Sequence, residues 1–206
     1  MSEKPPVHSL AQLVTACEAL EGQIDLEPEV ARYRPFYHPW WMLDQKAKHY
    51  RMFVAYGQLY RPRRVLEVGT GYGSGAVVLA RHAEEVVTAD ITFRNVPGGL
   101  FPSHVKPLLL RHPDECLTLP YDEFDFVYID IDPHDGKYER LIHECLSQSH
   151  QGVVAYDDIN YQGLRQVWDS IPQEKVITDW HLDAGFGLVR YGDNSCPTSP
   201  LTTPSA

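Results

Sequence analysis

The sequence is short of basic residues. Lys and Arg number 18 against 28 Asp and Glu among 206 residues, which gives a formal net charge of -10. Affinity for nucleic acid that does not depend on base sequence comes mainly from clustered Lys and Arg, which neutralise the phosphates. We therefore expect no nucleic-acid substrate.

Paired cysteines and long apolar runs are also lacking. The four cysteines are far apart and form no CxxC pair, so neither a zinc knuckle nor a disulfide framework is expected. No apolar run approaches the length that spans a membrane, and the opening "MSEKPPVHSL" contains no apolar signal segment. The expectation is a cytoplasmic protein without a membrane anchor.

Short apolar runs follow one another from Arg63 onward: "RVLEV", "VVTADI", "KPLLL", "FDFVYID" and "GVVAYD". Runs that do not alternate with polar residues are typical of parallel strands covered on both faces. Helix-like or turn segments separate them, which predicts a doubly wound, Rossmann-like α/β sheet. The last two runs, "KVITDWHL" and "FGLVRYG", predict an antiparallel hairpin at the sheet edge.

Three regions are expected along the chain. Residues 1–60 form a helical cap or lid, with one helix after Ser9 and another over 42–60. Residues 61–192 form the cofactor-binding domain, and the Pro/Ser/Thr-rich residues 193–206 form a disordered tail. Between the two helices, "RYRPFYHPWW" carries two prolines that disfavour a helix. Its tryptophans Trp40 and Trp41 are expected in the core, and a lid facing the substrate is the alternative.

A glycine-rich turn joins the first predicted strand to a helix in "VLEVGTGYGSGAVVLA", with Gly69, Gly71, Gly73 and Gly75 at alternate positions. Glycine allows a sharp turn and brings backbone N–H groups close to a ligand. The spacing also satisfies the G-x-G-x-x-G/A dinucleotide fingerprint. Asp90 ends the second predicted strand, where a carboxylate can bind ribose hydroxyls. The cofactor is therefore S-adenosylmethionine, which Glu67 favours, or NAD.

Carboxylates follow the fourth and fifth predicted strands, in "YIDIDPHDGKYE" and "AYDDIN". The carboxyl ends of parallel strands meet at one edge of the sheet, so Asp130, Asp132, Asp157 and Asp158 are expected to converge there. Several acids in one place favour a bound cation, and oxygen ligands suit Mg²⁺ or Ca²⁺. Solvated strand ends are the alternative explanation.

Through "EVGTGYGSG" and Asp90, the sequence resembles the class I S-adenosylmethionine-dependent methyltransferases. The resemblance covers roughly residues 43–191 and implies the fold, the cofactor and a reversed seventh strand. Segment 92–105 departs from the family, because its prolines and glycines leave little room for the usual crossover helix. The residues that the resemblance assigns to the cofactor are Glu67, Gly69, Thr70, Gly71, Tyr72, Gly73, Ser74, Asp90, His112, Asp114 and Asp130.

A narrower resemblance comes from "FVYIDIDPHDGKYE" and "GVVAYDDINYQGLRQVW". These segments look like the metal-dependent small-molecule O-methyltransferases, especially those acting on macrolide sugars, and more distantly like catechol O-methyltransferase. The resemblance implies Mg²⁺ on Asp130, Asp157 and Asp158, with Asp158 the stronger ligand candidate. His134 would be the general base. The implied reaction is methylation of a hydroxyl on a small molecule such as a sugar or catechol.

Other readings stay open alongside this one. An NAD-dependent oxidoreductase would explain the glycine loop and Asp90 but not the acidic residues, and a binding protein could keep the fold without turnover. Asn160 and Tyr161 are further substrate candidates, while Tyr138 and Trp168 are expected in the core. Acceptor specificity is expected from the N-terminal helices, from segment 92–105 and from a partner subunit in a homo-oligomer.

Overall fold

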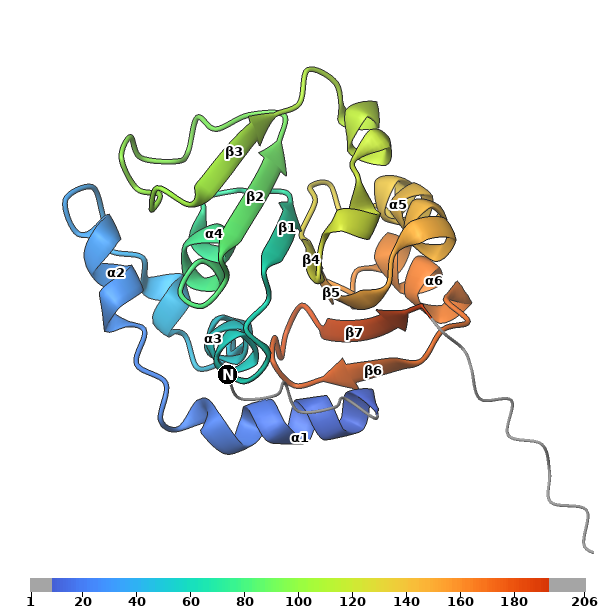
Figure 1. Ribbon diagram of the computed structural model, residues 1–206, viewed down its shortest axis with the longest axis horizontal. Helices are drawn as coiled ribbons and strands as arrows, with labels where there is room; N and C mark the ends of the chain where they lie inside the picture. Colours follow the sequence, from blue (N-terminus) through green and yellow to red (C-terminus); the bar gives the residue numbers. More distant parts are fainter. Residues whose placement is uncertain (1–8, 193–206) are drawn as a thin grey trace, which may run out of the picture.

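A computed structural model describes residues 9–192, so the predicted tail at 193–206 lies outside the described residues. Its centre is one seven-stranded sheet in the order β3-β2-β1-β4-β5-β7-β6. Only β7 runs against its neighbours, pairing antiparallel with β5 and with β6, which confirms the predicted Rossmann-like α/β sheet and its hairpin (Figure 1). The strands are β1 Arg64–Val68, β2 Glu85–Asp90, β3 Val105–Leu109, β4 Phe126–Ile129, β5 Gly152–Asp157, β6 Lys175–Thr178 and β7 Phe186–Tyr191.

Helices cover both faces of this sheet. Two apolar clusters result: α1 to α4 enclose one against the first face, and α5, α6 and η2 enclose the other against the second. Strand residues buried on both faces explain why the sequence shows continuous apolar runs. No helix of residues 9–192 is both long and apolar enough to cross a membrane. The helices are α1 Leu10–Glu21, α2 Glu27–Tyr33, η1 Trp40–Leu43, α3 His49–Tyr60, α4 Ser74–Leu79, η2 Pro113–Thr118, η3 Tyr121–Glu123, α5 Lys137–Ser149 and α6 Gln162–Ser170.

The N-terminal region differs from the prediction in three places. Helix α2 was not expected, and α3 begins at His49 rather than at residue 42. The later start follows from a turn in which Asp44 accepts a hydrogen bond from the backbone N–H of Lys46, after which Ala47 pairs with His181. Trp40 is 65% exposed, so its expected place in the core is wrong.

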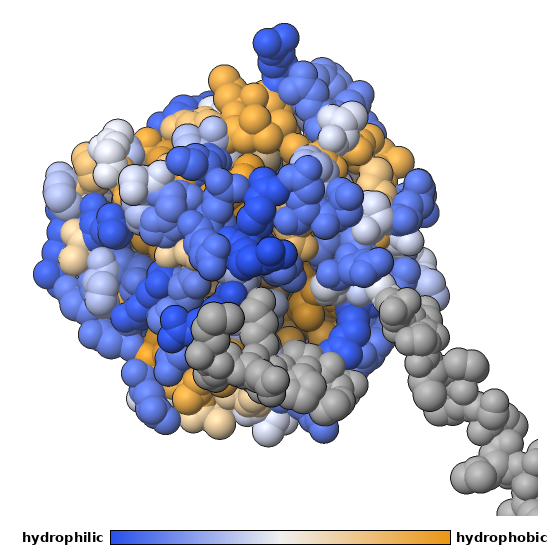
Figure 2. All heavy atoms as spheres, in the orientation of Figure 1, coloured by the Kyte–Doolittle hydropathy of each residue, from blue (hydrophilic) through white to orange (hydrophobic). Residues whose placement is uncertain are grey.

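The β3 edge of the sheet is open. Segment 91–104 forms turns and no helix, as predicted, so most of β3 faces solvent, including Pro107 and Leu109. Beside it lies a hollow of about 370 Å³ with an apolar lining. Figure 2 shows apolar side chains at the surface near this strand. The lining residues are Phe93, Val96, Pro97, Gly98, Phe101, Pro107 and Leu109.

A buried histidine on the second face makes stability depend on pH. His150 is 3% exposed; its Nδ1 lies 2.8 Å from the carbonyl of Tyr121, and its Nε2 has no partner. Burial lowers the pKa of His150. In acid, His150 is therefore protonated in the unfolded chain at a pH where it is still neutral in the folded chain. Stability supported by neutral His150 is therefore lost as the pH falls below about 6.5.

We expect His150→Gln to reduce the drop in melting temperature between pH 7.5 and pH 5, because glutamine does not titrate. Thermal unfolding of both proteins at the two pH values measures this. His38→Gln, which changes an exposed histidine, serves as the control and should keep the wild-type drop. An unchanged drop in His150→Gln would contradict the assignment.

Candidate active site

The glycine loop follows β1 and leads into α4. Gly69, Gly71 and Gly73 have positive φ angles of 93°, 52° and 82°, a conformation that favours glycine. At Gly69 an added Cβ would lie 1.8 Å from the carbonyl oxygen of Asp130, so β1 and β4 approach closely there. At Gly71 an added Cβ would meet nothing within 4 Å. The loop thus packs tightly against the end of β4 at Gly69, whereas the space next to Gly71 is empty.

The buried side chain of Glu67 packs against the glycine loop. This side chain is 1% exposed, accepts a hydrogen bond from the Thr88 hydroxyl, and leaves room only for glycine at position 75. Burial, together with Asp130 and Asp90, raises the pKa of Glu67 well above its ordinary value. The side chain therefore lies against the start of α4, where it holds the glycine loop in place.

Asp90 joins the end of β2 to the glycine loop. Its Oδ2 accepts hydrogen bonds from the backbone N–H of Thr70 (2.7 Å) and Gly71 (3.3 Å), and its Oδ1 accepts one from Thr92 (3.0 Å). A carboxylate offers about four acceptor positions. Asp90 therefore keeps capacity for about one more hydrogen bond, such as one from a ribose hydroxyl.

Aromatic residues from the N-terminal region cover the start of α4. The Trp41 indole N–H donates to the Ser74 hydroxyl (2.9 Å), and the Tyr33 hydroxyl lies 3.4 Å from the same oxygen. The exposed ring of Tyr72 packs against Trp41, with centroids 5.1 Å apart, and against Tyr37. The predicted cap thus contacts the glycine loop directly, and the side chain of Ser74 is bonded to this cap.

The two candidates for the adenine lie at the beginning of η2. The side chains of His112 and Asp114 are both 64% exposed, and His112 Nδ1 accepts a hydrogen bond from the Asp114 backbone N–H. Asp114 also accepts a hydrogen bond from the Tyr138 hydroxyl, and the partly buried Tyr138 packs at the margin of the second apolar cluster rather than within it. Trp168, by contrast, is 3% exposed and lies in the core as predicted.

Three of the predicted residues meet beyond the ends of β4 and β5. One donor atom of each of Asp130, His134 and Asp158 lies within 4.8 Å of the others. His134 Nε2 is 2.9 Å from Asp158 Oδ2 and 3.2 Å from Asp132 Oδ1. The hydrogen bond to Asp158 raises the pKa of His134 to about 9. In this arrangement His134 carries its proton at neutral pH.

A tyrosine links this group to the remaining aspartate. The Tyr128 hydroxyl lies 3.1 Å from Asp130 Oδ2 and 3.1 Å from Asp157 Oδ2. It has one hydrogen to donate, so the second contact needs a proton on a carboxylate. Burial and the charges of Asp157 and Asp158 raise the pKa of Asp130 to about 8, whereas the pKa of Asp157 is lowered, so Asp130 is the more readily protonated of the two.

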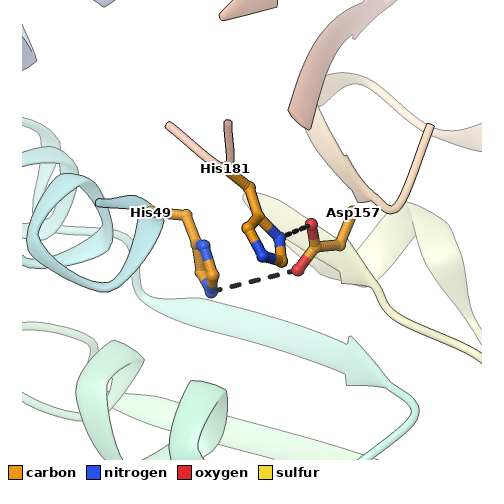
Figure 3. A group of neighbouring side chains, drawn as sticks. All are labelled: His49, Asp157 and His181. Carbon is orange, nitrogen blue, oxygen red and sulfur yellow. Dashed lines mark hydrogen bonds and ion pairs between the residues drawn. The ribbon is translucent and has the colours of Figure 1, made fainter. Parts of the chain in front are cut away.

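Asp157 belongs to a second group, formed with two histidines (Figure 3). His181 Nδ1 is 2.6 Å from Asp157 Oδ1, and His49 Nε2 is 3.9 Å from Asp157 Oδ2. Although burial acts in the opposite direction, the two histidines bring the pKa of Asp157 below its ordinary value. The structure thus brings together only two of the three predicted metal ligands, Asp130 and Asp158, and pairs Asp157 with His181.

His49 is the least satisfied side chain of this second group. It is 2% exposed, and neither ring nitrogen has a hydrogen-bond partner. Burial lowers its pKa to about 4, so the ring is neutral. An unpaired buried polar group costs about 1–3 kcal/mol, and so His49 calls for an explanation.

Sequence reasoning missed three residues of the site, His49, His181 and Tyr128. The two histidines lie 132 positions apart and in no motif; the pairing of Ala47 with His181 and the hydrogen bond from the His49 N–H to the Trp180 carbonyl bring them together. Tyr128 lies within the expected strand, where a buried aromatic residue is ordinary. Asn160 and Tyr161, the further substrate candidates, are exposed, and the Tyr161 ring lies 5.0 Å from that of His134.

No protein-family model matches this sequence, and no curated protein matches it. Solved structures match the fold. The SAH-bound methyltransferase PaMTH1 of Podospora anserina has a TM-score of 0.64 and 17% identity, over 94% of this chain and 100% of that one. TomG, an O-methyltransferase of Streptomyces achromogenes involved in tomaymycin synthesis and solved with SAM, has a TM-score of 0.60 and 20% identity, over 93% and 100%.

An O-methyltransferase of Bacillus cereus in complex with SAH is similar over 91% of this chain and 92% of that one, with a TM-score of 0.53 and 18% identity. All three similarities extend over nearly the whole length of both chains. The chain therefore has the fold of these methyltransferases.

Proposed function

We propose that the chain is an S-adenosylmethionine-dependent methyltransferase that methylates a hydroxyl group of a small molecule. The observation that carries the proposal is the juxtaposition of the open glycine loop with Asp90 on one side and the Asp130, His134 and Asp158 group on the other, at the carboxyl ends of β1, β2, β4 and β5. In open α/β sheets ligands bind in this place. The neighbouring folds bind SAM or SAH, which supports the same cofactor here.

The cofactor would lie against the open side of the loop. Gly71 leaves space for it, and Asp90 offers its remaining acceptor position to the ribose. The exposed side chains of His112 and Asp114 are the proposed adenine contacts, and hydrogen bonds from the Asp114 backbone N–H and the Tyr138 hydroxyl hold them at the start of η2. The Tyr72 ring, held by Trp41, would exclude water on the side of the cap.

A divalent cation fits the acidic group, because the carboxylates of Asp130 and Asp158 are oxygen ligands of the kind that Mg²⁺ prefers. Burial, and then the charges of Asp157 and Asp158, raise the pKa of Asp130, and a bound cation would relieve both the burial cost and the repulsion. When bound, the cation would lower the pKa of an acceptor hydroxyl. Asp157 remains the third predicted ligand and would have to leave His181 to reach this position.

The chemistry is a displacement at the methyl carbon. The acceptor oxygen forms a bond to that carbon while the bond from carbon to sulfur breaks, and the electron pair stays on the sulfur. The hydroxyl proton goes to a base, and His134 is our proposed base. A base must be unprotonated, so His134 can act only after its own proton has passed to solvent. That loss would follow if a cation on Asp158 removed the hydrogen bond that raises the pKa of His134.

Thermal unfolding with added ligands tests the cofactor. We expect S-adenosylhomocysteine to raise the melting temperature, since a ligand at 100 times its dissociation constant stabilises a protein by about 2.7 kcal/mol. NAD at the same concentration should leave it unchanged. A rise with NAD and none with S-adenosylhomocysteine or S-adenosylmethionine would overturn the proposal in favour of an oxidoreductase.

A further inference from the structure

We propose that His49, Asp157 and His181 form a binding site for a transition-metal dication such as Zn²⁺, separate from the acidic group of Asp130 and Asp158. One donor atom of each residue lies within 4.8 Å of the others. Figure 3 shows the three side chains pointing toward one another from α3, from the end of β5 and from the segment after β6. This inference does not rest on the methyltransferase function.

His49 is the observation that points to a ligand. It is 2% exposed, both of its ring nitrogens lack a partner, and Nε2 faces Asp157 Oδ2 across 3.9 Å. That separation is too long for a hydrogen bond. An ion that takes nitrogen and oxygen ligands at about 2.0–2.2 Å reaches both atoms across such a gap.

Packing fixes the His49 ring in this direction. The ring is stacked on Phe186, with centroids 5.5 Å apart and an interplanar angle of 7°, and it touches Phe53 on a second side. Its backbone N–H is bonded to the carbonyl of Trp180, next to His181. The ring therefore cannot rotate toward another hydrogen-bond partner, and its nitrogens are left for a ligand that binds between His49 and Asp157.

His181 supplies the third donor atom and lies on the side from which an ion can reach the site. Its ring centroid lies 4.9 Å from that of His49, and its side chain is 26% exposed, so an ion can enter from this side. The ring now makes its hydrogen bond to Asp157 through Nδ1. Metal binding would replace that hydrogen bond, and the exposed side would leave a position for water.

The donor set selects the kind of metal. Two neutral imidazoles and one carboxylate carry a charge of −1, which favours a dication. Imidazole suits Zn²⁺, Fe²⁺, Co²⁺, Ni²⁺ and Cu²⁺, whereas Mg²⁺ and Ca²⁺ prefer oxygen. Asp157 would serve this histidine site, and Asp130 and Asp158 would remain for the acidic group.

Calorimetric titration of the full chain with Zn²⁺, after removal of metals by a chelator, tests the proposal. We expect one equivalent to bind at this site, and its affinity to fall in His49→Gln and in His181→Gln by more than the roughly 10- to 100-fold that loss of an outer-shell partner costs, because each variant loses a direct ligand. His38→Gln, at an exposed histidine, and Asp158→Asn should keep the wild-type affinity. Pulsed EPR of the Cu²⁺-loaded protein should show two imidazole nitrogens, and one in each ligand variant.

Absence of Zn²⁺ binding to the wild type would overturn the proposal, and so would unchanged affinity in both ligand variants. Loss of binding in Asp158→Asn with full binding in His49→Gln would also overturn it, because the ion would then lie in the acidic group. Far-UV circular dichroism checks the fold of His49→Gln, and the partly exposed His181 provides the second variant. Stabilisation by S-adenosylhomocysteine, measured separately, distinguishes failure here from failure of the proposed activity.

Discussion

The Asp158→Asn variant is expected to transfer methyl groups about 10²- to 10³-fold more slowly than the wild type, because Lewis-acid assistance is worth several kcal/mol and each 1.36 kcal/mol is a factor of ten. Its affinity for S-adenosylhomocysteine should stay unchanged, since the polar contacts of Asp158 are with Asp157, Tyr161 and His134 and not with the glycine loop. Asparagine is the suitable replacement, because residue 158 has φ of 59° and asparagine tolerates this conformation better than alanine does. Transfer of a labelled methyl group to catechols and sugar diols measures the rate.

A chelator separates the cation from the side chain. EDTA should slow the wild type to the rate of Asp158→Asn and should slow that variant no further. Asp169→Asn, at an aspartate that pairs with Arg165 on α6, is the control and should keep the wild-type rate. Undiminished wild-type activity in excess EDTA would rule out the cation and leave the methyltransferase proposal standing.

Gly69→Ala is expected to reduce the free energy of unfolding by about 4 kcal/mol or more, an effect at the upper end for single substitutions. Two costs combine there: a positive φ of 93°, and a Cβ placed 1.8 Å from the Asp130 carbonyl oxygen. Relief requires β1 and β4 to separate at the point where both contribute to the site. Urea denaturation measures the loss, and failure of the variant to fold is its extreme form.

Gly71→Ala is the matched control, because φ is 52° there and an added Cβ meets nothing within 4 Å. It carries the backbone cost alone, about 1–2 kcal/mol. Equal losses in the two variants would show that close approach at Gly69 does not matter. Cofactor binding can be compared in the same two variants, because the cofactor is proposed to lie against Gly71 and not against Gly69.

The sheet could be predicted because its cause is local. Runs such as "RVLEV" and "GVVAYD" are apolar on both faces, and that pattern alone calls for strands covered on each side. The beginning of α3 at His49 could not be predicted in this way, because it depends on the pairing of Ala47 with His181, 134 positions later. Trp40 was misplaced for a similar reason: composition gives no sign of which of two adjacent indoles faces inward.

The candidate site divides along the same line. Asp130, His134 and Asp158 follow strand ends, and strand ends in a parallel sheet meet, so their proximity could be inferred from the sequence. The partner of Asp157 could not, because adjacent residues at a strand end point to different sides. Asp158 turns outward through its positive φ toward His134, while Asp157 stays with β5 and meets His181.

The open β3 edge bears on how copies of this chain meet in solution. The carbonyl of His104 and the N–H of Leu110 both form hydrogen bonds with β2. Backbone groups alternate in direction along a strand, so those of Val105, Pro107 and Leu109 point away from β2, toward the open edge. Pro107 thus stands where a further strand would need a donor, and it has none. If a strand of a second copy paired with β3, its hydrogen bonds would be interrupted at Pro107, the middle residue of β3. The proline therefore disfavours aggregation through this exposed apolar edge.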